Sequence, residues 1–219
     1  MEFIKDIKGI IFDLDGTMLD SLGMWADLDG IFLREKNIIP PEGLKHAIEG
    51  LSFKETAEYF KSEFSLEESV DELVELWHDE IERIYPFLPF KNGVREFIEA
   101  SLDKDLKIGL ATSNSFKLAH DVLSEQDYID FFDVLVSADQ VGRGKPSPDV
   151  FLEAARRMNL KPQECLVLED TLMGVKGAKS AGMITIAIFD RYNNGRWKEI
   201  EAEADYTVEN YQELFELFA

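Results

Sequence analysis

Short apolar runs rich in β-branched residues recur along the chain at wide spacing. They cover residues 7–12, 106–111, 134–136, 166–168 and 184–188, with a weaker run at 206–208. From the second run onward, the intervals carry apolar residues at helical spacing, as between residues 94 and 102. Strands that alternate with helices predict a parallel sheet with both faces covered, and therefore an α/β fold.

The interval from residue 21 to residue 87 breaks this alternation. It contains no convincing strand but several amphipathic stretches, at residues 24–34, 44–49, 53–60 and 70–85. Two prolines, Pro86 and Pro89, stiffen the return to the alternating pattern. We therefore predict a Rossmann-like parallel-sheet core of residues 1–20 and 88–219, with an inserted α-helical cap domain of residues 21–87.

The chain of 219 residues is strongly acidic. It has 44 acidic residues against 23 basic ones and a net charge of −21, and residues 21–87 alone hold 16 acids against 6 bases. No basic stripe is available to meet nucleic-acid phosphates or an anionic membrane, so we expect neither as a partner.

A single cysteine, Cys165, excludes an internal disulfide framework and lies in an apolar run, where we expect it to be buried in a strand. No stretch approaches the ~18 uninterrupted apolar residues of a spanning helix. Charges also occupy the first residues, where a signal peptide needs an apolar segment. We expect a cytoplasmic protein.

Two carboxylates follow the first predicted strand directly, in Asp13-Leu14-Asp15-Gly16. Ligands of parallel sheets bind beyond the carboxyl ends of the strands, and Gly16 permits a sharp exit there. Such a pair can bind a hard divalent ion, or can divide the roles of nucleophile and general acid. Taken alone, the pair is equally typical of an ordinary turn.

Hydrogen-bonding side chains follow the second predicted strand, in Thr112-Ser113-Asn114. They can donate to phosphate oxygens, although they could equally cap the next helix.

The later strand ends add charge to this set. Lys145 lies between turn-forming residues after the third strand, which suits a fixed positive charge, and Glu169-Asp170 follow the fourth. Because the carboxyl ends of parallel strands share one edge, these side chains together predict a site for a divalent ion and a phosphate group.

The motif order Asp-x-Asp-Gly-Thr, Thr112, Lys145-Pro146 and Glu169-Asp170 resembles that of the haloacid dehalogenase superfamily over nearly the full chain. The resemblance is closest to its β-phosphoglucomutase and phosphoglycolate phosphatase branch, which has a helical cap. It implies that Asp13 is the nucleophile and forms an aspartyl-phosphate. Asp15 would protonate the leaving oxygen and then activate water.

The same resemblance implies a magnesium ion as cofactor. Its ligands would be the Asp13 carboxylate, the Asp15 carbonyl and Asp170, with Glu169 bound directly or through water. Thr112 and Lys145 would hold the transferring phosphoryl group. We expect three further residues to border the substrate there: Gly16, Ser113 and Asn114.

The cap predicts a phosphatase rather than a mutase. Phe53 stands where the resembled mutases have an arginine, and Trp25 and Trp77 replace a histidine and a lysine, although the neighbouring Lys54 could substitute for the missing charge. We assign these four residues to substrate binding, with packing in the cap core as the alternative for the aromatic ones.

We expect a monomer or weak homodimer that hydrolyses a small phosphorylated metabolite, such as a sugar phosphate. A sugar phosphomutase and a non-catalytic phosphometabolite-binding regulator remain as alternatives.

Overall fold

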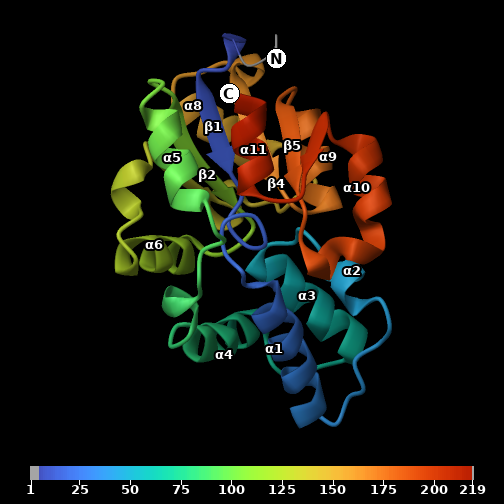
Figure 1. Cartoon of the computed structure of the whole chain (residues 1–219). Coiled ribbons are helices and arrows are strands. Elements are labelled where there is room, and N and C mark those ends of the chain that lie inside the picture. The colour runs from blue at the N-terminus through green and yellow to red at the C-terminus, as the bar shows by residue number, and fades with distance from the viewer. Residues whose placement is uncertain (1–4, 219) are drawn as a thin grey trace.

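Six parallel strands form one sheet in the computed structural model, which describes residues 5–218 apart from the side chains of residues 79 and 80. The strand order is β3-β2-β1-β4-β5-β6 (Figure 1). The strands are β1 (Gly9–Phe12), β2 (Lys107–Thr112), β3 (Val134–Ser137), β4 (Cys165–Glu169), β5 (Ile184–Ile188) and β6 (Tyr206–Val208). This order has a switch point at β1, where ligands of doubly wound sheets bind. The predicted α/β core is confirmed.

Helices cover both faces of the sheet because neighbouring strand residues alternate between two apolar cores. Ile10 and Phe12 pack towards one face and Ile11 towards the other. The first face carries α5 (Val94–Leu102), α6 (Phe116–Glu125) and α11 (Tyr211–Phe218). The second face carries α8 (Asp149–Arg157) and α9 (Leu172–Ser180), and α10 (Trp197–Glu203) packs on α9. Shorter elements are α7 (Ala138–Val141), η3 (Ile129–Phe131), η4 (Pro162–Glu164) and η5 (Arg191–Arg196).

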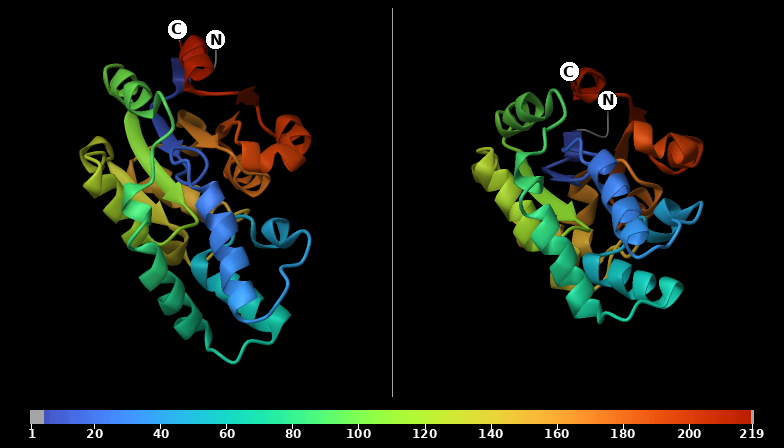
Figure 2. Two further views of the ribbon diagram at one scale, coloured as in Figure 1. Left: turned by 60° about the horizontal axis from the view of Figure 1, so that its bottom comes forward. Right: turned by 90° about the horizontal axis from the view of Figure 1, so that it is seen from below.

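A helical cap lies beyond the carboxyl ends of the strands, between β1 and β2 in sequence (Figures 1 and 2). It consists of α1 (Leu22–Glu35), α2 (Leu44–Ile48), α3 (Phe53–Phe64) and α4 (Val70–Ile81). Rings of Phe32, Phe60 and Trp77 meet edge to face or tilted at its centre, with centroids 5.1 to 6.1 Å apart. The cap is thus built around an aromatic core of its own.

The two connections between core and cap run side by side. The amide of Asp20 donates to the Pro89 carbonyl (3.0 Å), and the amide of Lys91 donates to the Met18 carbonyl (2.7 Å). Leu19 and Phe90 form an isolated antiparallel bridge between them. The chain therefore connects the cap to the core at one place, next to the end of β1.

Two predicted helix ends differ from the structure by four residues. The stretch predicted to end at residue 60 continues to Phe64, and the one predicted for residues 70–85 ends at Ile81. A 3-10 turn, η2 (Tyr85–Phe87), follows it, because Pro86 has no amide hydrogen with which to continue an α-helix. None of the described helices combines the length and apolar character needed to cross a bilayer.

Candidate active site

The pairing of β1 with β4 brings the Asp13 motif and the Glu169-Asp170 motif together. β1 pairs with β4 so that Phe12 lies opposite Leu168, and the amide of Asp13 donates to the Leu168 carbonyl (2.9 Å). Asp13, the first residue after β1, therefore lies beside Glu169, the last residue of β4. Both are at the edge of the sheet where the sequence predicts a ligand site.

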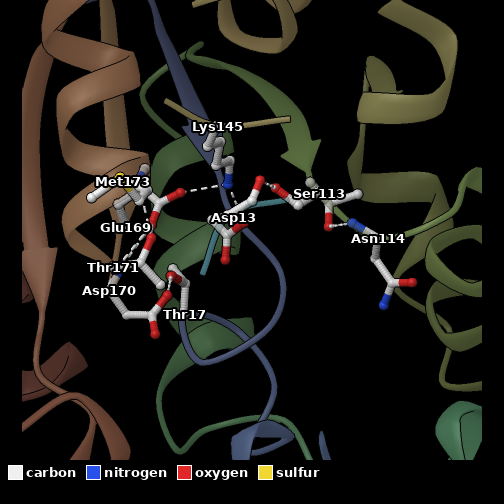
Figure 3. Close-up of polar contacts among 12 residues, drawn as sticks. Asp13, Thr17, Ser113, Asn114, Lys145, Glu169, Asp170, Thr171 and Met173 are labelled. Carbon is white, nitrogen blue, oxygen red and sulfur yellow. Dashed lines mark hydrogen bonds and ion pairs between the residues drawn. The ribbon is translucent and has the colours of Figure 1, made fainter. Parts of the chain in front are cut away.

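Lys145 lies between the two acids that this register brings together (Figure 3). Its ammonium group donates to Oδ1 of Asp13 and to Oε1 of Glu169, and all three side chains are buried. Burial alone would lower the pKa of Lys145, but the two carboxylates outweigh it and hold that pKa above its ordinary value. Lys145 is thus a fixed cation at the end of β1.

Asp170 completes a group of three buried acids. Its carboxylate accepts from the Thr17 hydroxyl (3.1 Å) and from the Asn193 amide. Both donors are neutral, and no described cation forms an ion pair with Asp170. Ligand oxygens of Asp13, Glu169 and Asp170 lie within 4.8 Å of one another, so the cluster is suited to a divalent metal ion.

The charges of this cluster are incompletely balanced. Burial, with a smaller effect of the Glu169 carboxylate, raises the pKa of Asp13 to about 7 even though Lys145 opposes the shift. Burial and the neighbouring acids also raise the pKa of Asp170 well above its ordinary value. Three buried carboxylates share one lysine, and a bound cation would reduce the repulsion between them.

Two glycines allow the backbone to approach these acids. Gly16 has φ +84°, and a Cβ there would lie 2.2 Å from Oδ2 of Asp170. A Cβ on Gly174, in the first turn of α9, would lie 1.9 Å from Oε1 of Glu169. A side chain at either position would displace a carboxylate of the cluster.

Asp15 accepts four hydrogen bonds from side chains that converge on it. Oδ1 receives the Ser21 hydroxyl (2.7 Å), the Trp25 indole N–H (2.8 Å) and the Tyr85 hydroxyl (2.8 Å). Oδ2 receives the Asn114 amide (3.0 Å). Burial, together with the Asp15 carboxylate, raises the pKa of Tyr85 well above its ordinary value. The hydroxyl therefore stays protonated and acts as a hydrogen-bond donor to Asp15.

The polar residues after β2 lie at the same edge. Thr112 is buried, and its hydroxyl accepts from the amide of Asn114 (3.0 Å). The Ser113 hydroxyl donates to the carbonyl of Gly50 (2.8 Å), which belongs to the cap. Ser115 rather than these residues caps α6, since its side chain accepts from the amide of Leu118.

A cavity of about 490 Å³ lies between this edge and the cap. Its wall includes the predicted residues Asp13, Asp15, Thr112, Ser113, Asn114, Lys145, Trp25, Phe53 and Trp77. Lys54 is exposed and is not among the residues that line the cavity. The assignment of Lys54 to substrate binding stays a prediction.

Three functional contacts come from residues outside the motifs, namely Ser21, Tyr85 and Asn193. A fourth comes from Thr17, the last residue of the Asp-x-Asp-Gly-Thr motif, for which the sequence predicts no role of its own. Asn193 belongs to the segment that follows β5, so the rule that ligands gather at strand ends could have drawn attention to it. Tyr85 has no such signal, because only the folded cap brings it to Asp15.

A family model described as "Haloacid dehalogenase-like hydrolase" matches residues 10–188. The chain belongs to this family. The predicted superfamily, its capped branch and the enzyme class, a phosphatase of this family, are confirmed.

Similar proteins include a phosphorylated carbohydrates phosphatase of Thermotoga maritima, which is 31% identical over 87% of this chain and 89% of that protein. Hexitol phosphatase B of Escherichia coli K12 is 30% identical over 84% of both chains. A solved structure of a putative β-phosphoglucomutase from Thermotoga maritima is 30% identical, with a TM-score of 0.71 over 96% of this chain and 98% of that one.

Proposed function

We propose that this member of the family is a magnesium-dependent phosphomonoesterase for a small phosphorylated metabolite, in particular a sugar or sugar-alcohol phosphate. The observation that carries the proposal is the buried Asp13 carboxylate, which Lys145 holds by one oxygen in the wall of the cavity. Among the described residues, no hydrogen bond reaches its second oxygen, so that atom is free to act as a nucleophile.

In the first step, the free oxygen of Asp13 attacks the phosphorus atom of the ester. The bond from phosphorus to the ester oxygen breaks, and Asp15 gives a proton to the departing alkoxide. Lys145 and Thr112 hold the phosphoryl oxygens, so that charge which spreads over them meets fixed donors. The products of this step are the free alcohol and an aspartyl-phosphate on Asp13.

In the second step, Asp15 accepts a proton from a water molecule, which attacks the phosphorus of the aspartyl-phosphate. The bond between phosphorus and the Asp13 oxygen breaks and inorganic phosphate leaves, which restores both aspartates. Asp15 thus has opposite roles in the two steps, as a general acid and then as a general base.

The donor set fits magnesium because hard carboxylate oxygens are its preferred ligands. Asp13 and Asp170 would bind the ion, with the Asp15 carbonyl as a further ligand and Glu169 as a direct or water-mediated one. When bound, the ion supplies neutralisation of the phosphoryl charge. Neutral donors from Thr17 and Asn193 keep the Asp170 carboxylate in place for this role.

The residues of the cap wall support a phosphatase rather than a mutase, which has to bind a second phosphate group. Phe53 lies in the wall and stacks on His78 (4.8 Å between ring centroids), which presents an aromatic surface where the resemblance predicts an arginine in a mutase. The Lys45 ammonium, a cap cation in the wall, is bound to Asn193 Oδ1 (2.9 Å) and to the Tyr192 carbonyl of the core. These contacts engage Lys45, which leaves Arg34 as the other cap cation in the wall.

Phosphate release from a panel of sugar, sugar-alcohol and aryl phosphates with magnesium tests the proposal. We expect turnover that falls on the order of 10³-fold or more in Asp13→Asn, because the amide cannot attack phosphorus. Turnover that survives Asp13→Asn would refute the nucleophile assignment. Isomerisation of a hexose phosphate without phosphate release would instead identify a mutase, and binding without any turnover would identify a regulator.

A further inference from the structure

The active-site cavity continues past Asp15 along the inner face of α1. Trp25, which donates to Asp15, and Asp29 both line it and lie four residues apart on that helix. Residues four apart share one face of a helix, about 6 Å apart along the axis. Asp29 is therefore one helical turn deeper in the cap than the residue that touches the proposed general acid.

The carboxylate of Asp29 has no partner. Among the described residues, no hydrogen bond or ion pair reaches it, and none links it to Arg34 or Lys45, the cations that line the cap part of the same cavity. Burial raises the pKa of Asp29 to about 7. A half-buried acid without donors is costly to the fold, so its presence in this wall calls for a ligand.

The other cap acid in the wall is already engaged, in contrast to Asp29. Oε1 of Glu49 accepts from the amide of Leu172 (2.9 Å), and its Oε2 pairs with Arg196 (2.7 Å). Asp29 is thus the carboxylate of the cap wall that remains available to a substrate.

We propose that Asp29 is a specificity residue that accepts a hydrogen bond from a hydroxyl of the leaving alcohol. The inference rests on the proposed phosphatase function and narrows its substrates to monophosphates of polyhydroxylated chains or rings. The accepted hydroxyl lies several carbon atoms from the ester, because Asp29 stands about 6 Å beyond Trp25.

The surroundings of Asp29 favour such a leaving group. A carboxylate repels a second phosphate and accepts from hydroxyl donors. The wall beside it is formed by apolar and aromatic side chains, including Leu28, Trp25 and Phe53, which can pack against the carbon faces of a sugar or alditol. An amino alcohol could also meet a carboxylate, so the test must separate the two classes.

The test compares three substrates, a hexitol monophosphate, phosphoethanolamine and para-nitrophenyl phosphate. Wild type, Asp29→Ala, Asp29→Asn and Asp27→Ala are assayed with each, where Asp27 is a matched exposed acid on the same helix. We expect Asp29→Ala to raise KM for the hexitol phosphate, so that the ratio of its kcat/KM to that of the aryl ester falls about tenfold. Asp29→Asn keeps an acceptor oxygen and should restore part of this ratio, and Asp27→Ala should leave it unchanged.

Several outcomes would overturn the inference. One is an equal loss on hexitol and aryl phosphates in Asp29→Ala with unchanged circular dichroism, and another is no loss on either. A wild-type preference for phosphoethanolamine would show that the carboxylate selects an amine. Failure of wild type to hydrolyse any of the three esters would instead count against the proposed function itself.

Discussion

The Oδ1 atom of Asp15 accepts from three donors that reach it from separate parts of the chain. Ser21 belongs to the first connection, Trp25 to the cap helix α1, and Tyr85 to the start of the return connection. The Trp25 indole is itself held edge to face against Phe53, with centroids 5.6 Å apart. These contacts position the Asp15 carboxyl group, which acts in both steps of the proposed mechanism. They depend on the position of the cap relative to the core.

Replacement of Tyr85 by phenylalanine tests this positioning. We expect kcat/KM for a sugar-alcohol phosphate to fall about tenfold, because kcat/KM reports the step in which the alkoxide leaves and an alkoxide needs a well-placed proton donor to leave. The aryl ester para-nitrophenyl phosphate should lose much less, since its leaving group is stable without a proton. Measurement of kcat and KM for both substrates decides the point.

Tyr59→Phe is the matched control, because Tyr59 packs among the cap aromatics and donates no hydrogen bond to Asp15. An equal loss of kcat/KM on the two substrates in Tyr85→Phe would contradict a role in placing the proton donor and indicate a general loss of structure.

At the scale of single residues, sequence reasoning succeeds where the backbone alone determines position. Asp13 and Glu169 could be placed together because parallel strands end at a common edge. Tyr85 could not, because its contact depends on the folded cap. For Asn193 the same rule indicates the segment after β5, but the contact of its side chain with Asp170 depends on the course of η5. Lys54 is not among the residues that line the cavity although its neighbour Phe53 is, since adjacent residues do not share one face of a helix.

Among the elements, α9 and the end of α2 form a contact that holds the cap against the core. Glu49 accepts from the first amide of α9, at Leu172, and pairs with Arg196 of η5. A carboxylate at a helix N-terminus satisfies an amide that the helix leaves free and faces the positive end of its dipole. A second contact joins Glu55 of α3 to the amide of Gly144 (2.9 Å), next to Lys145.

Replacement of Arg196 by methionine should weaken cap closure. The pair is largely buried and worth about 1 kcal/mol, so its loss should raise the open fraction about fivefold. Hydrogen exchange at the amides of Leu172 and Met173 measures this change, because both donate to Glu49 when the cap is closed. Arg156→Met is a suitable control, since Arg156 pairs on the exposed surface of α8. Unchanged exchange in Arg196→Met would show that the pair does not restrain the cap.

Elements were predicted from the sequence more reliably than their ends. Periodicity identified the four cap helices, because each buries an apolar face in the cap core. The end of α4 depends on Pro86 and on the short η2 turn, which periodicity does not describe. The division between core and cap at residues 21–87 stays a prediction.

For the molecule as a whole, the buried acid cluster should make stability depend on magnesium. A ligand that binds only the folded state adds about 2.7 kcal/mol when its concentration is about 100 times Kd. For a chain of this size, that corresponds to a rise in Tm of about 5 to 10 °C. Thermal unfolding with magnesium and with a chelator measures the shift without any substrate.

Asp170→Asn provides the control for this measurement. It removes a proposed ligand and one of the three buried charges, so the variant should lose most of the magnesium-induced shift. A wild-type Tm that does not respond to magnesium would contradict the metal site.

The single attachment of the cap has a consequence for how new selectivity can arise. Because both connecting strands run side by side at Leu19 and Phe90, the cavity-facing positions of α1, α2 and α3 can change without altering the backbone that carries Asp13, Lys145 and Asp170. Laboratory selection for new substrates should therefore accumulate substitutions in those three helices, while the strand ends stay as they are. Exchange of the whole inserted segment between relatives should transfer preference for the alcohol and leave the chemistry intact.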